Sequence, residues 1–160
     1  MQNRWIYLSH RISDKLSAYG DGERVNLTFS KKMSCGDACN NSHVNMSLHY
    51  GTHIDFPFHF YEKGKKACEY SPDFFVSKNV AVIDERYFSI SNSLIEFDFP
   101  MIEESFSSDS DVILVNEDIL LIEDIDYSQL AENEKVRELI ISPLIFEGAD
   151  AAPATLLARV

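Results

Sequence analysis

Basic residues are scarce in this 160-residue chain, which has 14 Lys and Arg against 26 Asp and Glu and a formal net charge of -12. A protein that holds nucleic acid by neutralising phosphates needs a basic face, so this composition excludes that class. The same acidity argues against docking on an anionic membrane. No apolar stretch approaches the roughly 18 to 20 residues that a membrane span requires. We therefore expect neither a nucleic-acid partner nor a membrane partner.

Cysteine is also rare, with three residues (Cys35, Cys39 and Cys68) in a chain long enough to fold without disulfides. An odd number of cysteines is most simply explained by reduced thiols in the cytosol. The first five residues show neither the apolar core nor the cleavage site of a secretory signal. The expected location is therefore cytoplasmic.

Apolar and aromatic residues, by contrast, are plentiful, with 45% hydrophobic residues that include eleven Phe and seven Tyr. This share argues for a folded core. Short apolar or alternating runs between polar turns predict one β-rich α/β (α+β) domain over residues 1–160, with little helix. The expected strands are residues 5–8, 25–29, 44–58, 74–84, 112–115, 119–122, 139–141, 144–146 and 155–160. Residues 14–22 are expected to form a turn, residues 35–42 and 105–111 loops, and residues 126–134 a short helix capped by Asp126 or Ser128.

The chemistry of the chain is concentrated in the segment HYGTHIDFPFH, residues 49–59. Along an extended strand, successive side chains point to opposite faces of the sheet. The even positions from 44 to 58 are almost wholly apolar, which suits a face packed on the core. The odd positions carry all the imidazoles and the one carboxylate of the segment, which are His49, His53, Asp55 and His59. We therefore expect a face on which metal-binding or acid–base groups gather.

The spacing leaves two geometries open for a metal site. On a straight strand His49 and His53 would have Cα atoms about 13 Å apart, at about 3.3 Å per residue. One shared ion would be hard to reach, because a zinc–imidazole bond is only about 2 Å long. Either the chain bends or bulges at Gly51 and brings both histidines to one ion, or each histidine takes its own ion and Asp55 bridges the two. His59 lies beyond Pro57 and suits a proton carrier better than a ligand.

This segment resembles the His-x-Gly-Thr-His-x-Asp-x-Pro-x-His signature of the cyclase family of metal-dependent hydrolases, which includes bacterial kynurenine formamidase and isatin hydrolase. Flanking segments agree with that family at residues 8–10, 61–64, 122–126 and 143–153. The resemblance covers both ends and most of the chain. It implies a swivelling β/β/α fold, assembled as a homodimer or a higher homo-oligomer. The fixed positions of the signature are all present, as His49, Gly51, Thr52, His53, Asp55, Pro57 and His59.

The resemblance also implies roles for individual residues. His49 and Asp55 would bind one divalent ion, and His53 with Asp55 a second, with Glu123 as a further ligand. His59 would be the general acid–base, and the metal would be zinc or manganese, with one or two ions per chain. The implied reaction is hydrolysis of a C–N amide bond by metal-activated water. The implied substrates are an aryl formamide such as N-formylkynurenine, or a cyclic amide (lactam).

The sequence departs from the family pattern in its middle segment. Family members carry a longer stretch there, with a further metal-binding histidine shortly before the glutamate. In this chain Asn116 follows Val115 at once, and no histidine occurs after His59. The second ion would lack one ligand unless His43, a partner chain or water supplies it. An alternative function follows, in which the protein keeps the fold and binds a metal, a small molecule or a partner chain without catalysis.

Overall fold

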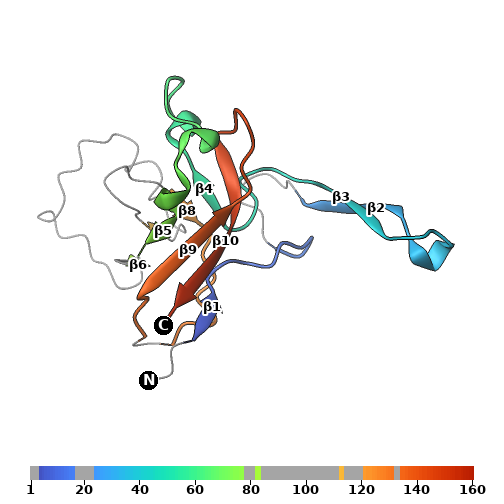
Figure 1. Ribbon diagram of the computed structural model, residues 1–160, viewed down its shortest axis with the longest axis horizontal. Coiled ribbons are helices and arrows are strands. Elements are labelled where there is room, and N and C mark those ends of the chain that lie inside the picture. Colours follow the sequence, from blue (N-terminus) through green and yellow to red (C-terminus); the bar gives the residue numbers. More distant parts are fainter. Residues whose placement is uncertain (1–3, 17–23, 78–81, 84–111, 114–120, 132–133) are drawn as a thin grey trace, which may run out of the picture.

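A six-stranded antiparallel sheet organises the computed structural model, which describes residues 4–16, 24–77, 82–83, 112–113, 121–131 and 134–160. The longest strand, β10 (Ala151–Arg159), runs through its centre (Figure 1). One side of β10 pairs with β9 (Glu138–Pro143), which in turn pairs with β5 (Val76–Ser77). The other side pairs first with β4 (His53–Asp55) and then with β1 (Trp5–Tyr7). Strand β8 (Leu121–Glu123) extends the sheet beyond β4.

The core is built from alternate side chains of these strands. Ile54 of β4, Ile122 of β8, Leu139 of β9 and Leu156 of β10 are all fully buried in one cluster. Because neighbouring positions on a strand face opposite ways, the residues on either side of Ile54 point to the other face of the sheet. The core thereby fixes the direction of His53 and Asp55.

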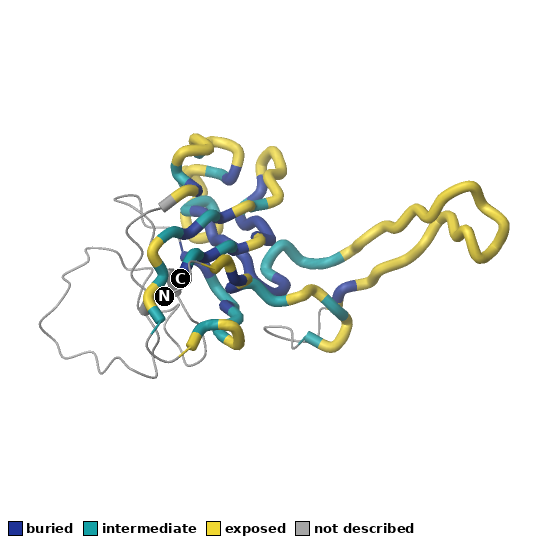
Figure 2. The backbone as a smooth tube through the Cα atoms, turned by 60° about the horizontal axis from the view of Figure 1, so that its bottom comes forward, coloured by how far each residue is buried: buried dark blue, intermediate teal, exposed yellow. Residues whose placement is uncertain are grey.

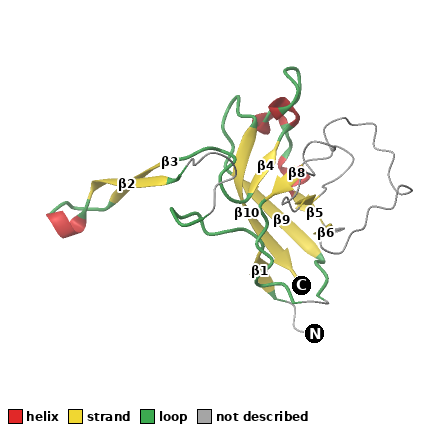
Figure 3. Ribbon diagram, turned by 180° about the vertical axis from the view of Figure 1, so that it is seen from behind, coloured by secondary structure: helices red, strands yellow, loops and turns green. Residues whose placement is uncertain are grey.

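Three short 3-10 helices follow β4 in the chain. Figure 3 colours the helices red. They are η2 (Pro57–His59), η3 (Ala67–Glu69) and η4 (Pro72–Phe75). Both η2 and η4 begin at a proline, whose fixed φ suits the first turn of a helix. A separate two-stranded pair is formed by β6 (Val82–Ile83) and β7 (Val112–Ile113).

The part of the chain that connects β1 to β4 forms a hairpin that projects from the sheet (Figures 1 and 2). It consists of β2 (Asn26–Lys31) and β3 (Asn41–Asn45), with the 3-10 helix η1 (Met33–Cys35) at its tip. Every residue of these three elements is exposed. Among the residues that the structure describes, no helix is long and apolar enough to cross a membrane.

The β-rich fold class predicted from the sequence is confirmed. The strands expected at residues 5–8, 25–29, 139–141 and 155–160 are found, with small shifts at their ends. The strands expected at 112–115 and 119–122 are found at 112–113 and 121–122, and their remaining residues lie outside the described part. The loop at 105–111 and residues 17–22 of the first turn also lie outside it. The prediction of one domain over residues 1–160 stays a prediction.

The long strand expected at residues 44–58 is wrong. Strand β3 ends at Asn45, a turn occupies residues 48–52, and β4 spans only three residues before η2 begins. The turn depends on Gly51, whose φ of 69° lies in the left-handed region that glycine adopts without strain. The bend anticipated at this glycine is therefore present.

Three other expected elements differ from the structure. Residues 126–134 form no helix in their described part, because the Asp126 carboxylate accepts the Ser128 N–H at 2.9 Å and closes a local turn instead. Residues 144–146 are irregular rather than a strand. Residues 74–75 end η4, so the strand expected at 74–84 begins only at Val76, and residues 78–81 and 84 lie outside the described part. The loop expected at 35–42 is found at residues 36–40, because Cys35 ends η1 and Asn41 begins β3.

Candidate metal centre

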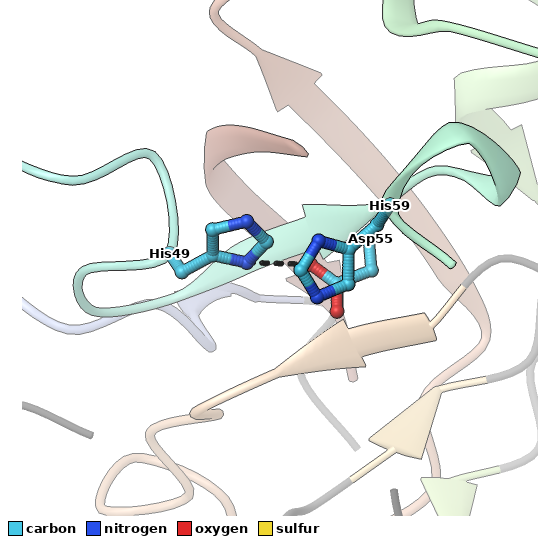
Figure 4. Close-up of side chains that lie close together, drawn as sticks. All are labelled: His49, Asp55 and His59. Carbon is cyan, nitrogen blue, oxygen red and sulfur yellow. Dashed lines mark ion pairs between the residues drawn. The ribbon is translucent and has the colours of Figure 1, made fainter. Parts of the chain in front are cut away.

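Five predicted site residues converge at the end of the sheet where β4 meets β8. His53 and Asp55 come from β4, where alternation places them opposite the buried Ile54, and they are 2% and 6% exposed. Glu123 ends β8 and stands directly across from His53 in the strand register. His49 lies in the turn that precedes β4, and His59 ends η2. Figure 4 shows the His49 ring directed at the Asp55 carboxylate, with the His59 ring beside it; the centroids of the two rings are 4.3 Å apart.

The side chains form two groups that share Asp55. The outer group consists of His49, Asp55 and His59, and the inner group of His53, Asp55 and Glu123. Within each group the potential ligand atoms lie within 4.8 Å of one another. The Asp55 Oδ1 atom is 2.9 Å from His49 Nδ1 and 3.4 Å from His53 Nε2. The inner group is completed by Glu123 Oε2, which lies 3.7 Å from His53 Nε2.

This arrangement combines the two geometries that the spacing left open. The chain turns at Gly51, which brings the His49 and His53 rings to a centroid distance of 5.1 Å. Asp55 nevertheless lies between the two histidines, as a bridging carboxylate would. His59, expected as a proton carrier, also lies in the outer group, where it could be the third side chain that contacts the same ion.

The hydrogen bonding of the buried atoms fits a cation. His53 Nδ1–H donates a hydrogen bond to the Gly51 carbonyl at 2.7 Å. The other ring nitrogen, Nε2, is then the lone-pair atom, and it faces Asp55 and Glu123. Neither His53 Nε2 nor Asp55 Oδ1 has a hydrogen bond of good geometry in the described part of the molecule. A buried acceptor without a well-directed hydrogen bond is costly, and a divalent ion between His53 Nε2 and Asp55 Oδ1 would supply that interaction. The residues present therefore fit a metal ion.

The charges of the two groups also favour a bound cation. Burial raises the pKa of Asp55, but the hydrogen bonds and charge interactions that it makes with His49 and His53 when those rings are protonated outweigh burial, and they hold that pKa well below its ordinary value. Burial and the nearby negative charge of Asp55 together raise the pKa of Glu123. The Asp55 carboxylate in turn raises the pKa of His49 to about 9, although burial acts to lower it. Two carboxylates that repel each other in a buried place would be stabilised by a cation.

Asp150 is a functional candidate that the sequence reasoning missed. Its Oδ2 atom lies 3.1 Å from His49 Nε2 and 3.0 Å from His59 Nδ1, so one carboxylate oxygen contacts both rings. Its neighbour Ala151 pairs with Asp55 across β10 and β4, which places Asp150 beside the residues that follow β4. In the sequence, Asp150 lies in the segment 143–153 that resembles the family, but the resemblance assigns it no role. A carboxylate on the far nitrogen of a metal-binding histidine fixes the orientation and protonation of the ring.

His43 lies away from both groups. It stands on the projecting hairpin, pairs with Thr28 in the register, and lies with Nε2 3.1 Å from Ser30 Oγ. The possibility that this chain's own His43 supplies the missing ligand is therefore wrong. Cys35 and Cys39, on the same hairpin, are exposed.

The model of the family described as "Putative cyclase" matches residues 6–137. The chain belongs to the cyclase family. The resemblance stated from the signature is thus confirmed.

The similar proteins are named kynurenine formamidase or isatin hydrolase. The chain is 34% identical over 93 residues to a kynurenine formamidase of Geobacillus thermodenitrificans, a match that covers 58% of this chain and 41% of that protein. It is 36% identical over 72 residues to a kynurenine formamidase of Bacillus cytotoxicus, with 42% and 32% of the two chains covered. The chain thus matches less than half the length of these curated relatives.

A solved structure is similar along nearly the whole chain. Isatin hydrolase A from Ralstonia solanacearum superposes with a TM-score of 0.65 and 12% identity, over 99% of this chain and 92% of that chain. This likeness shows that the cyclase-family chain has the same fold.

Proposed function

We propose that this cyclase-family chain is a metal-dependent hydrolase of a C–N amide bond, in an aryl formamide such as N-formylkynurenine or in a cyclic amide. The observation that carries the proposal is the buried Asp55 carboxylate shared by two groups of potential ligands. A divalent ion bound there would polarise an amide carbonyl and lower the pKa of a water molecule. The names of the similar proteins support the substrate class.

In this proposal His49, His53, Asp55 and Glu123 hold one or two ions. Imidazole and carboxylate ligands suit zinc and also manganese. The Asp55 Oδ1 atom lies 2.9 Å from His49 Nδ1 and 3.4 Å from His53 Nε2, so one carboxylate oxygen adjoins a potential ligand of each group. The ions of two-metal hydrolytic sites are about 3.5–4 Å apart, a separation that one bridging carboxylate can span.

The proton transfers fall to His59, which is the most exposed of the three site histidines. Asp150 Oδ2 accepts from its Nδ1 at 3.0 Å, so Nε2 is left free to take up a proton. The imidazole can then pass that proton to the leaving amine, as a general acid–base must. Because the His59 ring is exposed, it can contact a substrate, whereas the buried His53 cannot.

A second candidate function rests on the number of ligands. The inner group has three protein ligands, and no histidine follows His59 in the sequence. A protein with the same fold that binds a metal, a small molecule or a partner chain without turnover would need no further ligand. This candidate predicts bound metal with no hydrolysis of any formyl amide or lactam.

We also propose that the chain forms a homodimer or a larger homo-oligomer. The hairpin supports this, because Leu27, Phe29 and Val44 share one of its faces and are 61%, 47% and 57% exposed. Two-stranded hairpins are marginally stable alone in water, and a second copy would cover this face. Size-exclusion chromatography with light scattering measures the oligomer directly, and a monomer at all concentrations would contradict it.

Metal analysis combined with an N-formylkynurenine assay tests the function. The wild-type chain should hold zinc or manganese in stoichiometric amount and lose activity with a chelator. The His53→Ala variant should lose both metal and activity, whereas the matched His43→Ala variant on the hairpin should keep both. Activity that is indifferent to chelator would overturn the proposal. Bound metal without turnover would favour the second candidate.

A further inference from the structure

Thr52 is buried between three segments and immediately precedes β4. It is 2% exposed, and its hydroxyl oxygen accepts the His10 N–H at 2.9 Å. The same hydroxyl donates to the Asp124 carbonyl, and the Thr52 carbonyl accepts the Ala154 N–H at 3.0 Å. Its neighbours in sequence are Gly51, which turns the chain, and His53 of the inner group. A single hydroxyl group thus joins the start of β4 to two other segments.

The partner Asp124 lies where β8 ends. It follows Glu123 directly, and its φ of 55° makes it the only residue besides glycines with a positive φ in the described ranges. Such a conformation is strained for an aspartate and persists only where surrounding contacts hold it. Because the backbone turns here, the Asp124 carbonyl points to Thr52 rather than continuing the β4–β8 ladder.

The segment after Asp124 is also attached to the N-terminal segment. Ser9 and Ile125 form an isolated bridge, and the Asp126 N–H donates to the Leu8 carbonyl at 3.0 Å. The Thr52 hydroxyl lies at the centre of this junction, because it contacts both His10 and Asp124. Removing it would leave the Asp124 carbonyl without this donor and the His10 N–H without this acceptor, at the residue next to Glu123.

We propose that Thr52 is a positioning residue that sets the separation of His53 and Glu123, and so determines how tightly the inner group binds a divalent ion. His53 and Glu123 stand opposite each other in the register, and Thr52 and Asp124 are the residues immediately beyond these ends of the two strands. The hydroxyl–carbonyl bond closes the ladder just beyond the ligand pair. None of the outer-group ligands is next to Asp124 in the sequence, so loss of the Thr52 hydroxyl should change metal binding by the outer group less. This inference rests on the proposed function only in that the inner group binds metal.

The test compares Thr52→Val, which removes the hydroxyl at nearly constant shape, with Thr52→Ser, which keeps it. The probes are Zn²⁺ and Mn²⁺ alone, titrated calorimetrically into the metal-free full-length chain. Loss of a group that orients a metal ligand typically costs 10- to 100-fold in affinity, so we expect Thr52→Val to bind at least tenfold more weakly. Thr52→Ser should stay within threefold of the wild type. Thr155→Val, the same change on the exposed face of β10, should have no effect.

A double-variant cycle separates positioning from general stability. In a Glu123→Gln background, where the inner group is already damaged, adding Thr52→Val should change affinity by less than threefold. If Thr52→Val does not fold, Thr52→Ala removes the same hydroxyl and is judged by the same criteria.

Three results would overturn the inference alone, given a wild type that binds metal. They are unchanged affinity in Thr52→Val, equal loss in Thr52→Ser, and an undiminished effect of Thr52→Val in the Glu123→Gln background. A wild-type chain that binds neither ion would overturn the proposed function and this inference with it.

Discussion

Binding of a metal ion to this site should displace a proton from His49. The Asp55 carboxylate, whose Oδ1 lies 2.9 Å from His49 Nδ1, raises the pKa of this imidazole to about 9. At pH 7 only about 1% of the metal-free protein then has a neutral His49. Since an imidazole binds metal only when neutral, the ion must compete with that proton.

The size of this effect follows from the pKa. Below pH 9, each unit of pH changes the fraction of neutral His49 about tenfold. The apparent metal affinity should therefore rise about tenfold per unit between pH 7 and 9 from this residue alone, and level off above pH 9. At pH 7, ion binding should release about one proton from His49.

The stability of the metal-free protein should have the opposite pH dependence. The pKa of His49 is higher in the folded state than its ordinary 6.5, so its contribution is fully present below pH 6.5 and is lost as pH rises through about 9. The shift corresponds to about 3 kcal/mol of unfolding free energy as an upper estimate. The lowered pKa of Asp55 expresses the same ion pair and is not added to this figure.

Calorimetry measures the released proton, when Zn²⁺ is titrated at pH 7 in two buffers of different ionisation enthalpy. The His49→Asn variant is the control, because it removes only this titrating group and should release about one proton fewer. Urea unfolding of the metal-free chain at pH 6.5 and pH 9 measures the second effect. Equal proton release in wild type and variant, together with a metal affinity that is flat from pH 7 to 9, would refute the reasoning.

Changes at three further positions should have separable effects. Asp150→Asn should lower turnover about 10- to 100-fold in a steady-state assay because its oxygen orients both His49 and His59, and unchanged turnover would contradict that role. In urea unfolding, Ile54→Val should cost about 0.5–1.5 kcal/mol and Ile54→Ala about 2–5 kcal/mol, since Ile54 is fully buried; a loss below 1 kcal/mol for Ala would place it outside the core. Gly64→Ala should cost about 1–3 kcal/mol, because a Cβ there would overlap the Pro57 carbonyl at the start of η2; a neutral result would mean that this loop adjusts freely.

The alternation of residues 53–56 was enough to predict the central part of the site. A three-residue strand with Ile54 in the core must point His53 and Asp55 the other way, and the structure has them so. The same pattern failed at residues 46–51, where the chain turns. Tyr50 is buried as the alternation requires, but through hydrogen bonds from its hydroxyl to the Ser13 and Leu16 carbonyls rather than on a strand. Periodicity reports which residues are buried more reliably than it reports the backbone that buries them.

Contacts between distant parts of the chain could not be predicted from local pattern. His49 and Asp150 are 101 residues apart in sequence and meet only because β10 pairs with β4. The helix expected after Asp126 had a valid capping residue, yet the cap closes a turn, because this segment is held against residues 8–10. Tertiary pairing outweighed local propensity in both places.

Anomalous scattering from a crystal of the full-length chain grown with Zn²⁺ or Mn²⁺ tests the central claim most directly. We expect density peaks against the Asp55 carboxylate, one beside His53 and Glu123 and, where a second ion binds, one beside His49. A map with no peak at Asp55, or with ions only at other places such as Cys35 and Cys39 on the hairpin, would contradict it.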